Sequence, residues 1–269
     1  MKLAFGWRNK SAPEIPALDY LNLGCGAHFS PEWVNVDLAS DDPRVLAHDL
    51  RKPLSFAAAS FSVVYHSHVL EHLSRSSGAT FLGECFRVLK PAGILRVAVP
   101  DLEKIALLYL EALRGATASD ESAARRYEWI VLELLDQMTR EQPGGEMLKY
   151  WRQNPMPAES FVFERMGREV RRVIERLRAK PASAARREAD APPTDRQAAE
   201  FRARGEIHKW MYDRHSLAEL LKQSGFTAPR LCAATESASP GFARMALDVD
   251  PDGSVRKPDS LFMEALKPR

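Results

Sequence analysis

The chain has 269 residues, which is enough to bury the core of one domain with an insertion. Its net charge of +2 selects neither an acidic nor a basic partner. The sequence has no long apolar run, and residues 1–10 lack the apolar core of a signal peptide, so we expect no membrane span. Cys25, Cys85 and Cys232 are far apart and lack metal-ligand spacing, which favours the reducing cytoplasm.

The most specific pattern lies between residues 20 and 37. An apolar strand runs into the turn Gly24-Cys25-Gly26, and a second strand ends on Asp37. Glycines let the backbone approach a ligand where a Cβ would clash. A carboxylate at the end of the following strand can accept hydrogen bonds from ribose hydroxyls. This pattern predicts an adenosine site.

Three further segments extend the pattern. Residues 46–50 look like a third strand end, residues 62–73 like a buried strand that runs directly into a helix, and residues 87–100 like a helix end, a turn and a fifth strand. The apolar spacing from Phe81 to Leu89 predicts one clear helix. Strands that alternate with short connections predict a mainly parallel sheet.

Residues 19–101 together resemble class I S-adenosyl-L-methionine (SAM) dependent methyltransferases. Residues 210–217 and 256–265 are similar to the closing segments of bacterial members associated with surface-polysaccharide biosynthesis. The resemblance implies an α/β fold with a Rossmann-like, mostly parallel seven-stranded sheet and a helical insertion after strand 5. It also implies SAM as the cofactor and S-adenosyl-L-homocysteine as the product.

The resemblance also implies a set of cofactor contacts. Gly24 and Gly26 would approach the methionine and ribose portions, Asp37 would bind the ribose, and Asp49 with Leu50 would meet the adenine. Asp37 could instead be a helix-cap acid, and Asp49 a turn acid. Asn22 stands where many relatives have an acid, and Ala27 where they often have a further glycine. The expected cofactor-binding residues are Asn22, Gly24, Cys25, Gly26, Asp37, Leu38, Asp49, Leu50 and Ser67.

The short spacing after the glycine turn leaves no room for a full crossover helix. Only ten residues separate Gly26 from Asp37, and Pro31 is one of them. One face of the sheet should therefore be thinly covered. We expect the helical segment after strand 5 to cover it and to cap the substrate side, although a stabilising appendage is an alternative. The expected divisions are a leader (1–18), the SAM-binding half of the sheet (19–100), an insertion (101–206) with a linker near 179–199, and the rest of the sheet (207–269).

The C-terminal part should return to the sheet. Ser216, with Glu219 three residues on, predicts a capping box at the start of a helix that Gly225 ends. Residues 230–235 and 260–266 then predict two strands of one hairpin.

Polar residues crowd the end of the fourth strand, where open α/β sheets bind ligands. His68 is the first candidate for a general base or substrate contact, and His72 follows one helical turn later. Asp101, directly after strand 5, could face the substrate or act as a helix N-cap. Each histidine could also be a hydrogen-bonded structural residue. We expect no metal here, because no acid and cysteine set lies nearby in the sequence.

Residues 165–187 contain nine Lys or Arg and two Glu. They could contact an anionic glycan, a lipid head group or nucleic acid, although such runs are usually solvated helix faces. Aromatic residues do not interleave with them, which makes nucleic acid an improbable partner.

The sequence favours a SAM-dependent methyltransferase that acts on an oxygen of a sugar or polysaccharide precursor, with a small-molecule or glycan acceptor. The alternative is a SAM-binding partner protein without catalytic activity. A nicotinamide dehydrogenase is disfavoured because Phe29 replaces the third glycine of the dinucleotide-binding pattern. The sequence does not indicate an oligomeric state.

Overall fold

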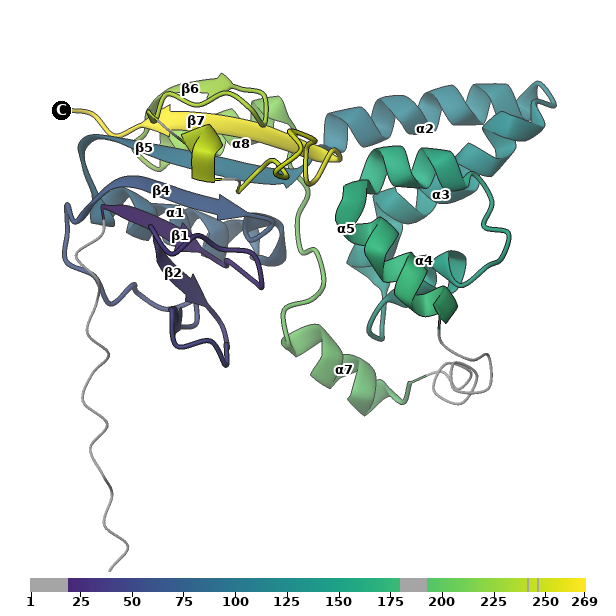
Figure 1. Cartoon of the computed structure of the whole chain (residues 1–269), viewed down its shortest axis with the longest axis horizontal. Helices are drawn as coiled ribbons and strands as arrows, with labels where there is room; N and C mark the ends of the chain where they lie inside the picture. The colour runs from purple at the N-terminus through teal and green to yellow at the C-terminus, as the bar shows by residue number, and fades with distance from the viewer. Residues whose placement is uncertain (1–18, 180–192, 241, 246) are drawn as a thin grey trace, which may run out of the picture.

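The computed structural model describes residues 19–179, 193–240, 242–245 and 247–269, and its centre is a seven-stranded sheet (Figure 1). The strand order is β3-β2-β1-β4-β5-β7-β6, and only β7 runs antiparallel to its neighbours. This is the sheet predicted from the sequence. The strands are β1 (Tyr20–Leu23), β2 (Val34–Asp37), β3 (Val45–Ala47), β4 (Phe61–Ser67), β5 (Leu89–Pro100), β6 (Thr227–Leu231) and β7 (Ser260–Leu266).

Helices lie between β4 and β5, in the insertion after β5, and before β6. Helix α1 (Arg75–Val88) connects β4 to β5, after the short 3-10 helix η1 (Leu70–His72), and α8 (Arg214–Gln223) precedes β6. The 3-10 helix η2 (Phe242–Met245) lies between β6 and β7. The predicted helical insertion after strand 5 is confirmed, and it contains α2 (Leu102–Thr117), α3 (Glu121–Thr139), α4 (Gly145–Trp151), α5 (Glu159–Ala179) and α7 (Asp195–Ala203). No described helix combines the length and the hydropathy that crossing a bilayer requires.

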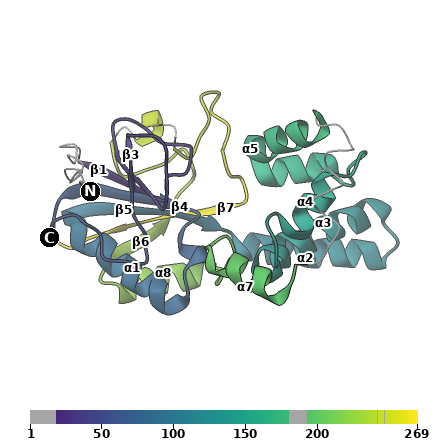
Figure 2. The same ribbon diagram turned by 90° about the horizontal axis from the view of Figure 1, so that it is seen from below.

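One face of the sheet is covered by α1 and α8 (Figure 2). The apolar stripe predicted for α1 is buried there, with Leu82 and Cys85 fully inaccessible. Ser74 caps the helix by accepting a hydrogen bond from the Ser77 backbone N–H. Leu217 and Leu221 of α8 complete this core. The periodicity of the two helices therefore fixes which face of the sheet they cover.

The other face is covered by the connection between β6 and β7, and not by the insertion as expected. Residues 24–33, between β1 and β2, contain no helix. Phe242 and Leu247 of the connection pack against Trp33 and Tyr65 instead. The insertion forms separate clusters around Trp129 and Ile130, and it lies beyond the carboxyl ends of the parallel strands (Figure 1). The expectation was wrong because the β6–β7 connection carries apolar side chains of its own.

Local boundaries differ from expectation at three places. Asp213, and not Ser216, is the N-cap of α8, and the Ser216 side chain completes its capping box. Strand β6 begins and ends earlier than residues 230–235. Part of the expected linker forms α7, which begins at a Thr194–Gln197 capping box. The expected leader and residues 180–192 of the linker lie outside the described residues.

Candidate active site

The glycine turn after β1 is shaped by steric constraints. Gly24 has φ +69°, and a Cβ added there would lie 2.3 Å from Val69 Cγ2. The backbone N–H groups of Gly24 and Cys25 both donate to the Val36 carbonyl, at 2.8 and 3.1 Å. Gly26 has φ +56°, and an added Cβ would meet nothing within 4 Å. The turn is therefore packed against the protein at Gly24 and open at Gly26.

Asp37 lies beside this turn. Its Oδ2 accepts a hydrogen bond from the Gly26 N–H at 2.6 Å, and its Oδ1 accepts one from the Leu38 N–H at 2.7 Å. A carboxylate offers about four lone-pair positions, so both oxygens can still accept from a diol. The Leu38 side chain is 54% exposed at the same edge. The fold thus joins the turn and the acid that the sequence singled out.

Asp49 and Leu50 follow β3. Both Asp49 oxygens accept hydrogen bonds from Arg51, at 2.8 and 2.9 Å. These bonds lower the pKa of Asp49 to about 2. Leu50 Cδ1 would lie 3.7 Å from a Cβ on Gly24, so Leu50 borders the glycine turn. Leu50 is therefore placed for an apolar contact with a ligand, whereas the Asp49 carboxylate is already paired.

A cavity of about 440 Å³ opens from the glycine turn toward the insertion. Five of the expected cofactor residues line it, namely Asn22, Gly24, Cys25, Gly26 and Ser67. Asn22 is buried and donates from Nδ2 to Asn35 Oδ1 at 3.2 Å, whereas its own Oδ1 has no partner among the described residues. A buried oxygen without a partner fits a ligand that carries a donor, such as the amino group of SAM.

The far wall of the cavity is cationic. Arg168, Arg172 and Arg176 are spaced by four residues along α5 and all line the cavity. Arg256 and Lys257, from the β6–β7 connection, complete the wall. The sequence left residues 165–187 as either an anion contact or a solvated helix face, and it did not say what the run faces. The four-residue spacing of the arginines predicts that they share one face of α5. No pattern in the sequence identifies Arg256 or Lys257 as part of the same wall.

Some of these cations are already paired with acids. Arg168 contacts Asp252 at 2.9 Å, and Arg256 contacts Glu169 and Asp250 at 3.6 Å each. Within the described part of the chain, Arg172, Arg176 and Lys257 form no ion pair. The lining of the cavity therefore carries more positive than negative charge, because only two carboxylates, Glu169 and Asp250, lie among its cations.

His68 is the only expected catalytic residue that lines this cavity. Its Nε2 lies 2.8 Å from Ser260 Oγ, and its Nδ1 lies 3.3 Å from Glu71 Oε1. Its backbone has a positive φ of 54°. Burial, reinforced by the charge of Lys257, holds the pKa of His68 well below its ordinary value. The imidazole is therefore neutral near pH 7.

The other two expected catalytic residues are engaged elsewhere. Asp101 Oδ1 accepts from the Lys104 backbone N–H at 3.0 Å, as the N-cap of α2. The His72 ring stacks edge-on against His208, with 4.8 Å between ring centroids. Neither Asp101 nor His72 is among the residues that line the cavity.

The chain was compared with protein-family models, curated sequences and solved structures. Residues 19–97 match the family model described as "Methyltransferase domain". No curated protein sequence matches the chain. The match spans β1 to most of β5, which is the half of the sheet that carries the glycine turn and Asp37.

Several solved methyltransferase structures are similar to the chain at low identity. The CurJ carbon methyltransferase has 12% identity and a TM-score of 0.40, covering 94% of this chain and 50% of that one. The Burkholderia thailandensis 1,6-didemethyltoxoflavin-N1-methyltransferase, with S-adenosylhomocysteine bound, has 12% identity and a TM-score of 0.38, covering 93% and 71%. A SAM dependent methyltransferase from Archaeoglobus fulgidus has 12% identity and a TM-score of 0.39, covering 94% and 87%.

Proposed function

We propose that this SAM-dependent methyltransferase methylates a hydroxyl oxygen of a sugar or polysaccharide precursor that carries an anionic group. The methyltransferase-domain match and the strand order carry the enzyme class, and SAM is the cofactor. The acceptor is our inference from the cavity, in which His68 lies at the end of β4, beside the glycine turn, and the unpaired cations lie on the wall formed by α5 and the β6–β7 connection. The three cysteines are free, which agrees with a reducing compartment.

The cofactor would lie along the glycine turn. The open side of Gly26 admits the ligand, Asp37 binds the ribose hydroxyls, and the unpaired Oδ1 of Asn22 accepts from the amino group. Leu50 is better placed than Asp49 for the adenine, because Arg51 already holds both Asp49 oxygens. SAM supplies a methyl carbon that its sulfonium has already activated. The protein therefore mainly has to align the acceptor and remove its proton.

His68 would remove the proton of the acceptor hydroxyl. With Nδ1 facing Glu71, the proton-accepting atom is Nε2, to which the Ser260 hydroxyl donates in the free enzyme. A positioned base contributes about 10²–10⁴-fold to turnover. His68→Ala should therefore lower kcat by that range and leave SAM affinity nearly unchanged, because the interaction acts in the transition state. His68→Gln should lower kcat as much as His68→Ala does if His68 is a base. Parental turnover in both variants would assign the residue a structural role.

The unpaired cations define the class of acceptor. Arg172, Arg176 and Lys257 could bind a phosphate or carboxylate through charge-assisted hydrogen bonds. Phosphorylated and nucleotide-linked sugars carry such groups, whereas neutral sugars do not. We expect methyl transfer from radiolabelled SAM to a member of the anionic class. A matched panel of neutral sugars, sugar phosphates, uronic acids and nucleotide sugars tests this expectation. Transfer to neutral sugars alone would overturn the acceptor class, and no transfer to any fraction of a host-cell extract would favour a non-catalytic SAM-binding role.

A further inference from the structure

We propose that Glu71, His72 and His208 form a binding site for one divalent transition-metal ion, with Zn²⁺ as the expected ion. One ligand atom from each side chain lies within 4.8 Å of the other two. Glu71 and His72 belong to η1, directly after β4, and His208 belongs to the segment that precedes α8. The sequence argued against a metal because no acid and cysteine set lies near these histidines, but the fold brings the remote His208 to Glu71 and His72.

The backbone around the three residues is held by hydrogen bonds between the two segments. The backbone N–H groups of Lys209 and Trp210 donate to the Glu71 carbonyl, at 2.7 and 3.2 Å. The His208 N–H donates to the Gln137 carbonyl at 2.9 Å. Metal bonds of about 2.0–2.2 Å require ligand atoms roughly 3–4 Å apart. Small side-chain rotations on this fixed backbone would bring the three ligand atoms to that separation.

His72 is already oriented as a metal ligand. Its Nδ1 lies 3.1 Å from the Ile207 carbonyl oxygen, to which it donates a hydrogen bond. A metal-binding histidine typically donates its other ring N–H to a carbonyl or carboxylate, which fixes the tautomer and the ring orientation. This bond leaves Nε2 of His72 deprotonated and free to coordinate.

Glu71 supplies the second, independent observation. Its side chain is fully buried, and neither carboxylate oxygen has a hydrogen-bond partner among the described residues. His68 Nδ1 lies 3.3 Å from Oε1, and the positive charge of Lys257 also acts on the carboxylate. A buried carboxylate without a donor is costly, and such groups are usually paired or bind a metal. A cation between Glu71, His72 and His208 would satisfy the carboxylate.

The donor set indicates the kind of metal. Two imidazole nitrogens and one carboxylate oxygen suit Zn²⁺ and similar divalent ions, whereas Mg²⁺ and Ca²⁺ prefer oxygen ligands. Three protein ligands leave a further position for water. The ion would join η1 to the segment before α8, beside His68 but without it as a ligand. Its binding should therefore stabilise the fold.

The test uses the full chain without a polyhistidine tag, treated with a chelator and then titrated with ZnCl₂ in a calorimeter. We expect one Zn²⁺ per chain with micromolar or tighter affinity, a Tm raised by several degrees, and no matching response to MgCl₂. His208→Ala and the isosteric Glu71→Gln should each weaken Zn²⁺ binding at least about 10–100-fold. His215→Ala is the matched control, because His215 is exposed on α8 and is not one of the three clustered residues.

Three results would overturn the proposal. They are no saturable Zn²⁺ binding by the parent chain, unchanged binding in both cluster variants, and equal losses in His215→Ala and the cluster variants. Far-UV circular dichroism of each variant separates loss of the site from loss of the fold, and Glu71→Gln keeps the test decisive if His208→Ala unfolds. None of these measurements depends on methyl transfer. The Zn²⁺ binding results therefore remain valid even if the proposed acceptor class is wrong.

Discussion

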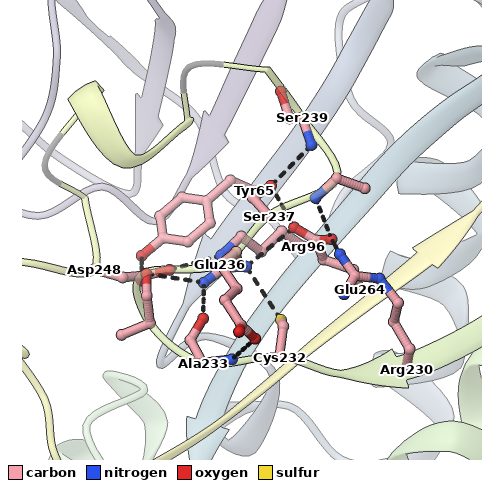
Figure 3. Close-up of polar contacts among 12 residues, drawn as sticks. Tyr65, Arg96, Arg230, Cys232, Ala233, Glu236, Ser237, Ser239, Asp248 and Glu264 are labelled. Atoms are coloured by element: carbon pink, nitrogen blue, oxygen red, sulfur yellow. Dashed lines mark hydrogen bonds and ion pairs between the residues drawn. The ribbon is translucent and has the colours of Figure 1, made fainter.

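Arg96, in the middle of β5, should be the most sensitive position for stability outside the cofactor site. Its guanidinium is fully buried and contacts Asp248 at 2.7 Å and Glu264 at 3.0 Å (Figure 3). It also donates to the Glu236 and Ala233 carbonyl oxygens, at 2.7 and 3.1 Å. One side chain therefore holds the β6–β7 connection onto the sheet.

Arg96→Met would leave Asp248 without its cation and Glu264 with Arg230 as its remaining partner, and the two carboxylate side chains are each only 2% exposed. Removing one partner of a buried ion pair costs about 3–5 kcal/mol. At about 2–4 °C per kcal/mol for a chain of this size, Tm should fall by roughly 6–20 °C. Urea unfolding followed by circular dichroism measures the free energy directly.

Arg44→Met is the control for this prediction, because Arg44 pairs with Asp42 on the surface and its side chain is 61% exposed. Exposed pairs contribute about 0–1 kcal/mol. If both variants lose less than 1 kcal/mol, the network does not hold the connection, and the reasoning from burial is wrong.

Three further predictions concern the cofactor site and the sheet. Asp37→Ala should weaken SAM binding about 10–100-fold in calorimetry, since a hydrogen bond to a charged group contributes roughly 1.5–3 kcal/mol, and unchanged affinity in a folded variant would contradict the ribose assignment. Gly24→Ala should destabilise by about 2–5 kcal/mol in urea unfolding, through positive φ and the contact with Val69, whereas Gly83→Ala, in α1 with open space around it, should stabilise by about 0.5–1 kcal/mol. Burial opposes ionisation of Glu264, but hydrogen bonds and the Arg96 charge outweigh it and lower its pKa from the ordinary value of 4.5. Its contribution to stability is therefore complete above pH 4.5 and lost as pH falls through the folded pKa, so the urea-midpoint gap to Glu264→Gln should shrink below about pH 4.5; a constant gap from pH 7 to 3 would refute this.

The half of the fold that carries the proposed cofactor site could be predicted because its determinants are local in sequence. The bond between Gly26 and Asp37 joins residues eleven apart, and the spacing of Phe81, Leu82 and Cys85 identifies the buried side of α1. Arg96 also has a recognisable signal in the sequence. An arginine within an apolar strand is rarely fully buried unless it is paired.

The acceptor side could not be predicted, because tertiary packing decides which remote residues meet. Helical spacing on α5 shows that Arg172 and Arg176 share a face, but it does not say what that face opposes. The position of Lys257 depends on a connection whose packing against Trp33 has no sequence signature. For the same reason, nothing in the sequence brings His208 to His72.

Topology explains why these remote segments meet at one edge. The strand order reverses between β1 and β4, and open sheets bind ligands at such a switch point, outside the carboxyl ends of the strands. The insertion leaves the sheet at the carboxyl end of β5. Because β7 is antiparallel, the β6–β7 connection re-enters the sheet at the same edge, where the Asp101 N–H donates to the Asp259 carbonyl at 2.9 Å. The strands β1 to β4 thus form the proposed cofactor side, whereas the insertion and the β6–β7 connection supply the cationic wall, so we expect differences in acceptor among similar chains to lie in these two segments.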